Sequence, residues 1–447
     1  MGIQAKQLCS KEIVTNRTFI SSSDIERLET IKLSENKFVI IYRQEGTFFA
    51  RVGNIDLEKN VVLGSAYSFP EGYSSDNVNY RISCLSENKF VVAYKDSDDD
   101  DQGKAMVGVI NNDEVTFGAS YVFRTFSTGV YSCVEINQNK ILITHTSGVI
   151  VGVIENNTEI SFGESVSINS DMVASKLQND KVFLGERSDN SFIGKVAEVV
   201  GDVITVGDNF TKDSGLDIRG DADVFSLGES KAGIAVRDFG NSSGALLIAE
   251  INGLQVTFGS VQSVLRRQNN ASRSITYSFS NDKIVSIGGT TIYIYDVVGK
   301  NVTEIASKTY AQSSFSVHTR LLKLSSSLGL LASPTNGVVP FEILGNDILL
   351  DIKPEDLIES ELGTHKEISS IYITRPGFGN VDIELYVYDN ELEQKNMLYR
   401  STIEEHKTEV IKLANCPIII EQGKKMALYT LSPRPIIVQA FGLEETL

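Results

Sequence analysis

The chain alternates short apolar runs with polar turns, and one turn motif recurs at a nearly constant interval. The segment Leu33-Ser-Glu-Asn-Lys-Phe-Val39 reappears as Leu85-Ser-Glu-Asn-Lys-Phe-Val91 and then in five weaker copies. A repeat of this period predicts seven similar structural modules. The fifth residues of the copies are Lys37, Lys89, Lys140, Lys181, Lys231, Lys283 and Leu328, so the spacings are 52, 51, 41, 50, 52 and 45 residues.

A second motif runs in phase with the first and divides each module into strands. Its clearest copies are Val115-Thr-Phe-Gly-Ala119, Ile160-Ser-Phe-Gly-Glu164 and Val256-Thr-Phe-Gly-Ser260. The best-preserved module predicts four short strands, at residues 80–85, 90–95, 105–110 and 115–123. The Asn- and Asp-rich segments between these strands are typical of tight hairpin turns.

The second predicted strand of each module is apolar at nearly every position, as in Phe38-Val-Ile-Ile-Tyr42 and Phe90-Val-Val-Ala-Tyr94. A sheet with one wet face would alternate, so both faces of each module must be covered. Four antiparallel strands in about 50 residues, repeated and covered on both faces, predict an all-β, seven-bladed β-propeller. A β-solenoid would have a shorter period without hairpins, and separate sandwiches would need about 100 residues each. A ring of six blades with an irregular seventh stays open.

Ring closure and the domain boundary follow from where the motifs begin and end. Residues 11–19 precede the first motif, and we predict that they form the outermost strand of the last blade. Residues 348–352 compete for that role. The propeller therefore spans residues 1–352, and the acidic segment 354–365 predicts a boundary with one short helical turn.

The tail, residues 353–447, has a different pattern. Runs such as Ile383-Glu-Leu-Tyr-Val-Tyr388 alternate cleanly, which indicates one buried and one wet face. A segment of this size and pattern predicts a small jelly-roll-like β-sandwich. Its strand-like runs are residues 368–374, 382–389, 398–403, 409–413, 418–421, 425–431 and 436–441.

Composition limits the partners and the compartment. The 447 residues carry a formal net charge of −17 without a basic cluster, so neither nucleic acid nor an anionic membrane is an expected partner. No apolar run reaches the roughly 20 residues of a spanning helix. Residues 1–10 do not have the pattern of a signal peptide, so we expect the chain to fold in a cytoplasm.

No catalytic signature stands out, and we predict no catalytic residue, no metal site and no cofactor. Motifs for a nucleophile elbow, a phosphate loop and a dinucleotide site are absent. The histidines, which lack the spacing of a metal pair, are His145, His318, His365 and His406. The cysteines, which are too few and too dispersed for a disulfide framework and are expected to be buried free thiols, are Cys9, Cys84, Cys133 and Cys416.

Two groups of side chains are candidates for binding, although neither defines a ligand site. The run Asp96-Ser-Asp-Asp-Asp-Asp101 offers closely spaced carboxylates, as calcium requires, but it lacks the Gly-centred alternation of a calcium loop. We favour a solvated hairpin tip in the second blade. The aromatic residues that border long loops, where they would stack on a partner or pack between blades, are Tyr67, Tyr73, Tyr80, Phe123 and Phe126.

Over residues 11–350 the repeats Lys-Phe-Val-Val-Ala-Tyr and Val-Thr-Phe-Gly-Ala-Ser resemble propeller repeats of bacterial and phage surface proteins. The tail segments Tyr399-Arg-Ser-Thr-Ile403 and Ile437-Val-Gln-Ala-Phe-Gly442 are similar to the terminal sandwiches of tail-fibre or baseplate-associated proteins from phages of Gram-positive hosts. The resemblance carries no catalytic motif. It implies a non-enzymatic structural or host-attachment protein of the virion, oligomeric in the particle, that contacts other tail proteins and a host-surface glycan or protein.

Two other classes of protein stay open at this point. Carboxylates contributed by different blades could meet in the central funnel of a propeller and form a glycan-active enzyme. Alternatively, the propeller could be a cytosolic protein-interaction scaffold unrelated to any virus.

Overall fold

A computed structural model of the chain describes its strands and their pairing. Within the described residues every regular element is a β-strand and none is a helix. The described residues are 6–13, 20, 25, 27–56, 61–69, 80–168, 171–178, 180–215, 218–238, 243–265, 275–288, 291–309, 319–333, 337–344, 347–350, 355–359, 364–374, 381–389, 395–403, 408–412, 418–420, 424–430 and 436–446.

The chain between residues 27 and 350 forms seven antiparallel sheets, each built from consecutive strands. Blade 1 contains β2 (Arg27–Lys32), β3 (Lys37–Gln44), β4 (Thr47–Ile55), β5 (Val61–Leu63) and β6 (Tyr67–Ser68), and blade 2 contains β7 (Tyr80–Ser86), β8 (Lys89–Asp96), β9 (Gln102–Asn111), β10 (Glu114–Phe117) and β11 (Tyr121–Arg124). Blade 3 contains β12 (Val130–Asn137), β13 (Lys140–His145), β14 (Gly148–Glu155), β15 (Glu159–Phe162) and β16 (Val166–Ser167), and blade 4 contains β17 (Val173–Lys176), β18 (Lys181–Ser188), β19 (Ser191–Val200), β20 (Val203–Val206) and β21 (Phe210–Asp213). Blade 5 contains β22 (Ile218–Ser226), β23 (Lys231–Asp238), β24 (Ser243–Asn252), β25 (Gln255–Phe258) and β26 (Gln262–Leu265), blade 6 contains β27 (Ile275–Ser280), β28 (Lys283–Gly288), β29 (Thr291–Val298) and β30 (Asn301–Thr309), and blade 7 contains β31 (Arg320–Lys323), β32 (Leu328–Ser333), β33 (Gly337–Leu344) and β34 (Asp347–Leu350).

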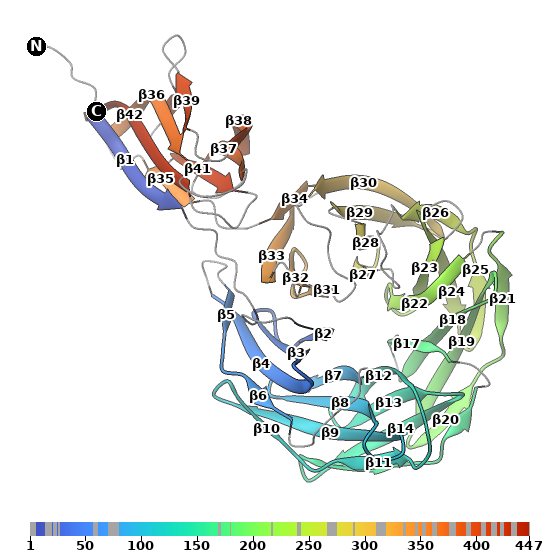
Figure 1. Ribbon diagram of the computed structural model, residues 1–447. Helices are drawn as coiled ribbons and strands as arrows, with labels where there is room; N and C mark the ends of the chain where they lie inside the picture. The colour runs from blue at the N-terminus through green and yellow to red at the C-terminus, as the bar shows by residue number, and fades with distance from the viewer. Residues whose placement is uncertain are drawn as a thin grey trace, which may run out of the picture.

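The seven sheets form the blades of a β-propeller, as the repeat predicts. The first strand of each blade lies nearest the centre of the ring, and the second, third and fourth strands follow outwards (Figure 1). In blades 1 to 5 the short fifth strand pairs with the same third strand as the fourth. In each blade the second strand ends, and the first and third strands begin, on one side of the ring, which we call the loop face. The first and third strands end on the other side, the hairpin face.

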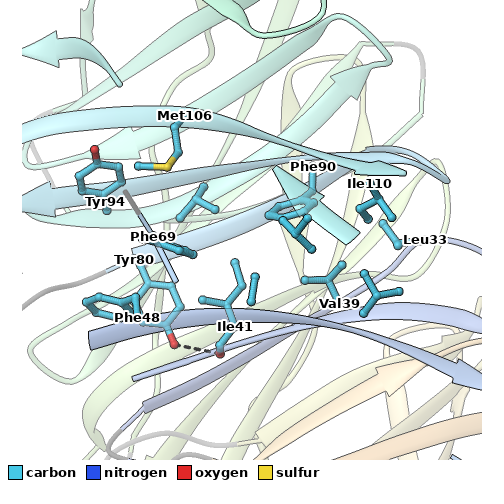
Figure 2. Close-up of a cluster of buried hydrophobic side chains, with 14 residues drawn as sticks. Leu33, Val39, Ile41, Phe48, Phe69, Tyr80, Phe90, Tyr94, Met106 and Ile110 are labelled. Carbon is cyan, nitrogen blue, oxygen red and sulfur yellow. Dashed lines mark hydrogen bonds between the residues drawn. The ribbon is translucent and has the colours of Figure 1, made fainter. Parts of the chain in front are cut away.

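Clusters of buried apolar side chains hold neighbouring blades together, one cluster at each of the seven junctions. Between blades 1 and 2, Val39 and Ile41 of β3 lie across from Phe90 and Tyr94 of β8 (Figure 2). The intervening residue Ile40 points to the opposite face of β3 and packs against blade 7. Successive strand residues thus serve two neighbours, which explains the continuous apolar runs.

The first motif recurs because it fixes a turn and also contacts the next blade. In all seven blades, the carbonyl oxygen of the residue before the fifth motif position accepts a hydrogen bond from a backbone N–H at the end of the third strand. The N···O distances are 2.7 to 2.9 Å. In blade 2 this bond runs from Ile110 N–H to Asn88 O. On the hairpin face of blade 1, Lys37 Nζ lies 2.7 Å from Asp113 Oδ1, in a turn of blade 2.

The glycine of the second motif marks a break in the outermost strand. Gly118 N–H donates to Val107 O at 2.9 Å, and the chain then leaves the ladder between β10 and β11. A Cβ on Gly118 would lie 2.9 Å from Cβ of Thr158, in a turn of blade 3. The single strand predicted at residues 115–123 is therefore wrong: it is two strands, because the neighbouring blade fills the space beside the glycine.

Side chains close the ring between blades 7 and 1. Leu324 and Leu330 of blade 7 share an apolar cluster with Leu28 of blade 1. Ile20 and Ile25, which precede the first blade, are also buried in this cluster. Residues near the start of the chain therefore help to seal the junction at which the ring begins and ends.

The predicted closing strand at residues 11–19 is described only in part. Residues 11–13 belong to β1 (Lys6–Ile13), which pairs with β42 (Ile436–Thr446), so these three residues do not extend blade 7. Their backbone hydrogen bonds are made with β42, in a ladder that runs from Lys6 opposite Gly442 to Ile13 opposite Ile436. Residues 14–19 lie outside the described residues, and for them the prediction stands as a prediction. The segment 348–352 competes for the role of outermost strand in blade 7. Its residues 348–350 lie in β34, which pairs with the second half of β33 at the end of the strand order of this blade.

The strands after residue 354, together with β1, form two further antiparallel sheets beside the ring (Figure 1). One has the order β1-β42-β36-β39 with β40 beside β36, and the other has the order β35-β41-β37-β38. Each of the seven strand-like runs predicted in the tail is a strand over its described residues. Of the segment 354–365, in which one helical turn is predicted, residues 355–359 pair with β41 and residues 364–365 begin β36, and the rest lies outside the described residues. The new strands are β35 (Glu355–Glu359), β36 (Thr364–Thr374), β37 (Val381–Asp389), β38 (Lys395–Ile403), β39 (Thr408–Lys412), β40 (Ile418–Ile420) and β41 (Lys424–Thr430).

Close packing of strand glycines against aromatic rings generates a test of the blade interior. Gly108 lies opposite Phe90, and a Cβ on Gly108 would lie 2.3 Å from a ring carbon of this fully buried side chain. We predict that Gly108→Ala lowers the free energy of unfolding by about 2 to 3 kcal/mol, measured by urea denaturation followed by circular dichroism. Gly163→Ala is the matched control, since a Cβ there meets nothing closer than 3.7 Å. Equal losses in the two variants would contradict the packing argument.

Candidate functional site

The innermost strands of the seven blades surround a central channel. It contains a cavity of about 310 Å³ to which every blade contributes at least one lining residue. Three of its four charged lining residues lie on blades 7, 1 and 2, whereas blades 4 and 5 contribute small or apolar side chains and the fourth charged residue, Asp223. The channel is therefore the first candidate site.

An arginine–carboxylate pair spans the junction between blades 7 and 1. Arg320 Nη2 lies 2.9 Å from Glu29 Oε1, and Arg320 Nε lies 3.0 Å from Glu29 Oε2. On the other side, Arg81 Nη1 of blade 2 lies 3.6 Å from Glu29 Oε1. Two parallel N–H···O bonds are the strongest arrangement of an arginine with a carboxylate. These side chains thus connect three consecutive blades at the closure of the ring.

The charge states of these groups are fixed by their surroundings. Burial alone would lower the pKa of Arg320, but Glu29, with a further contribution from Asp223 on blade 5, raises it above its ordinary value. For Tyr80 the effect of burial is the opposite, and it raises the pKa of the hydroxyl. This hydroxyl donates to Ile41 O at 3.2 Å. Arg320 therefore stays charged, and Tyr80 stays neutral, throughout the physiological pH range.

Side chains in the channel also pair with the inner edges of the blades. A strand with no neighbour on one side presents backbone groups that need partners. Arg81 Nε donates to Tyr131 O of blade 3 at 2.8 Å, and Ala174 N–H of blade 4 donates to Ser132 Oγ of blade 3 at 2.8 Å. Polar residues in the inner strands therefore satisfy the backbone of the next blade.

The charged residues of the channel were not predicted from the sequence. Glu29, Arg81, Asp223 and Arg320 each lie eight positions before the fifth residue of the first motif. A charged residue at this one repeat position, inside an innermost strand, is the signal that would have identified them.

On the loop face, the acidic run from Asp96 to Asp101 forms the turn between β8 and β9, as predicted for a hairpin tip. Lys104 Nζ lies 2.8 Å from Asp96 Oδ2 and 2.9 Å from Asp99 Oδ2, and Lys95 Nζ lies 2.9 Å from Asp101 Oδ1. The hydrogen bond from Lys95 lowers the pKa of Asp101. Carboxylates that already pair with two lysines offer calcium few ligands. Among all the residues that the structure describes, no three His, Cys, Asp or Glu side chains form a group that could hold a metal ion.

Beside this turn, the connection between blades 2 and 3 presents an exposed aromatic ring. Phe126 is 60% exposed, and the guanidinium carbon of Arg124 lies 4.1 Å from its ring centroid. Arg124 Nη1 donates to Nδ1 of the buried His145 at 2.9 Å. Ser127 Oγ donates to Asp101 Oδ2 at 3.2 Å, which ties the connection to the acidic turn. We call Phe126, Arg124, Ser127 and Asp101 the rim patch.

The buried side chain of His145 holds Arg124 of the rim patch in place. Burial and the charge of Arg124 lower the pKa of His145 to about 4, so its ring is neutral at pH 7. Nδ1 lies 2.9 Å from Arg124 Nη1 and 3.1 Å from the carbonyl oxygen of Thr146, and Nε2 lies 2.8 Å from Ser165 Oγ. Polar contacts on both ring nitrogens hold the imidazole in place beneath Arg124.

The aromatic residues that border the loops have different environments. Tyr80 and Phe123 are buried between blades, and Tyr67 is half-buried against the cluster between blades 1 and 2. Phe126 is exposed. Tyr73 lies outside the described residues.

The predicted free thiols are confirmed for the two cysteines whose side chains the structure describes. Cys84 is half-buried and Cys133 is buried, and burial raises their pKa to about 11 and about 12, which makes them poor nucleophiles. For the other singled-out histidines and cysteines no side-chain position is described: these are His318, His365, His406, Cys9 and Cys416. In the portion of the chain covered by the structure, no helix is suited to crossing a bilayer.

The fold is similar to solved structures at low sequence identity. A protein from Lactobacillus plantarum matches with a TM-score of 0.51 and 10% identity, over 73% of this chain and 95% of that chain. Hsv2 of Kluyvelomyces marxianus matches with a TM-score of 0.43 and 8% identity, over 74% of this chain and 97% of that one. YCF48, solved bound to D1 peptide, matches with a TM-score of 0.46 and 8% identity, over 75% and 95% of the two chains. No protein-family model and no curated protein sequence matches the chain. The likeness to the first structure shows the propeller fold alone.

The bidentate pair predicts a measurable contribution to ring stability. Glu29→Gln keeps the shape of the side chain but leaves the charge of Arg320 unpaired, and we expect it to lower the free energy of unfolding by on the order of 2 kcal/mol. Glu135→Gln is the matched control, because Glu135 pairs with Lys176, whose side chain is 41% exposed, and such pairs contribute less than about 1 kcal/mol. Urea titrations of both variants decide the question, and an equally small loss in Glu29→Gln would show that the pair does not stabilise the ring.

The lowered pKa of His145 predicts acid sensitivity. The folded-state pKa of about 4 lies below the ordinary value of 6.5. The contribution of neutral His145 to the free energy of unfolding is therefore complete above pH 6.5 and is lost as the pH falls towards 4. The loss amounts to at most about 3 kcal/mol. His145→Gln removes the titrating group, so its free energy of unfolding should fall less steeply than that of the wild type between pH 6.5 and pH 4. Parallel pH profiles would refute the assignment.

Proposed function

We propose that the chain is a non-enzymatic structural and host-attachment protein of a phage tail or tail-like particle, located in the virion. The propeller serves as a rigid platform, and its rim patch contacts a glycan or protein of the host surface. The rim patch carries this proposal, because its exposed ring stacks on an arginine that is itself held by a buried histidine. Rigid aromatic and arginine side chains dominate the energetics of interfaces. The resemblance of the repeats to phage surface proteins supports the assignment to a particle.

The charges in the channel support binding over glycan hydrolysis. The acid of a glycosidase must keep its proton near neutral pH, which requires a raised pKa. Glu29 instead lies between Arg320 and Arg81, and two neighbouring cations favour the ionised carboxylate. This arrangement favours recognition over acid catalysis.

We further propose that the two sheets beside the ring pack as a small jelly-roll-like β-sandwich that docks neighbouring tail proteins and supports oligomerisation in the particle. The size of the tail and the alternation of its strands support this arrangement. The pairing of β1 with β42 means that the module combines residues 6–13 with residues 355–446. A fragment used to test docking must therefore include both segments.

The attachment proposal predicts a specific loss of binding. Phe126→Ala removes an exposed ring, so it should weaken binding of the full-length protein to Gram-positive host cells at least about tenfold without lowering the melting temperature. Binding is measured by flow cytometry of labelled protein across a panel of strains.

Val298→Ala provides the matched control. Val298 is 76% exposed at the end of β29, on the hairpin face of blade 6, so its truncation removes a similarly exposed apolar side chain far from the rim patch. Cell binding of this variant should equal that of the wild type. Equal binding by all three proteins, or no binding by the wild type to any strain, would exclude attachment through the rim patch.

A further inference from the structure

The central channel combines a side rich in charge with a side rich in small residues within one cavity. Arg320, Glu29 and Arg81 line the first side, and Ala174 and Ala222 of blades 4 and 5 line the second, where Asp223 is the one charged lining residue. The small alanine side chains leave the cavity open to about 310 Å³, which lies at the lower end of the range for small-molecule sites. The space would hold on the order of ten water molecules at about 30 Å³ each.

Blade 6 adds an aromatic surface to this cavity. Tyr277 lines the channel and is 38% exposed, and the adjacent Thr276 contributes a hydroxyl that shares a hydrogen bond of 3.2 Å with Ser286. An aromatic face beside carboxylates and guanidinium groups suits a ring that is apolar on its faces and polar at its edge. A sugar ring has this distribution of polarity.

The charges that line the cavity restrict the ligand further. The cavity is lined by two guanidinium groups, of Arg81 and Arg320, and by two carboxylates, of Glu29 and of Asp223 on blade 5. A charged ligand meets no net opposite charge, and it must compete with the bidentate Arg320–Glu29 pair. A neutral hydroxyl group can donate to a carboxylate and accept from a guanidinium without breaking that pair, since each carboxylate has about four lone-pair sites.

We infer that the channel binds a neutral, hydroxyl-rich ligand of roughly one or two sugar rings, stacked on Tyr277 and hydrogen-bonded to the charged side. The channel shares no residue with the rim patch. The inference therefore stands or falls independently of the attachment proposal.

Isothermal titration calorimetry of the full-length protein tests this inference. The probes are maltose, cellobiose and N,N′-diacetylchitobiose, with glucuronic acid and glucosamine as charged counterparts. We expect at least one neutral disaccharide to bind with a Kd below about 1 mM and more tightly than either charged sugar. Tyr277→Ala and Ala222→Leu should each weaken its binding at least about tenfold, and Val298→Ala should leave it unchanged.

Three results would contradict the proposed binding of a neutral sugar in the channel. Absence of binding by every neutral probe, tighter binding of a charged sugar, or unchanged affinity in Tyr277→Ala would each overturn the inference. Ala222 is buried, so Ala222→Leu is interpreted only if circular dichroism shows a native fold. Tyr277 is partly exposed, and its truncation decides the question when the other variant does not fold. Cell binding by Phe126→Ala is measured separately and does not bear on this result.

Discussion

No blade can bury both of its apolar faces by itself, and the rest of the structure depends on this constraint. The second strand of each blade carries side chains that pack alternately against the preceding and the following blade. A linear stack would leave one face of its first and last modules exposed. The cluster between blades 7 and 1 removes both exposed faces at once, and the Arg320–Glu29 pair adds a directional contact at the same junction.

The sequence was sufficient to predict the blades because the repeated residues have repeated contacts. The motif lysines, such as Lys37, reach the next blade, and the second-motif glycines Gly118 and Gly259 make room for it. The split of the outermost strand was missed, because the atoms that force it belong to a different module. The pairing of β1 with β42 was also beyond local patterns, since it joins segments at opposite ends of the chain.

The two candidate sites were predictable to different degrees. The acidic turn and Phe126 stood out as a charge run and a loop aromatic, yet their partners Lys104 and His145 did not. Partners that come from other strands depend on tertiary geometry, which a linear pattern does not contain. The charged residues of the channel share one repeat position, which is a weaker signal. That signal can be interpreted only when the position is known to face the central axis of the ring.

Hydrogen exchange in a variant of the ring junction tests the closed ring most directly. Leu330→Ala removes a fully buried side chain between blades 7 and 1 and should cost about 2 to 5 kcal/mol. In a closed ring that unfolds as one unit, amides of β18 on distant blade 4 should lose as much protection as amides of β32, measured by mass spectrometry. Loss of protection confined to blades 7 and 1, with β18 unchanged, would show that the blades form an open array and would contradict the account.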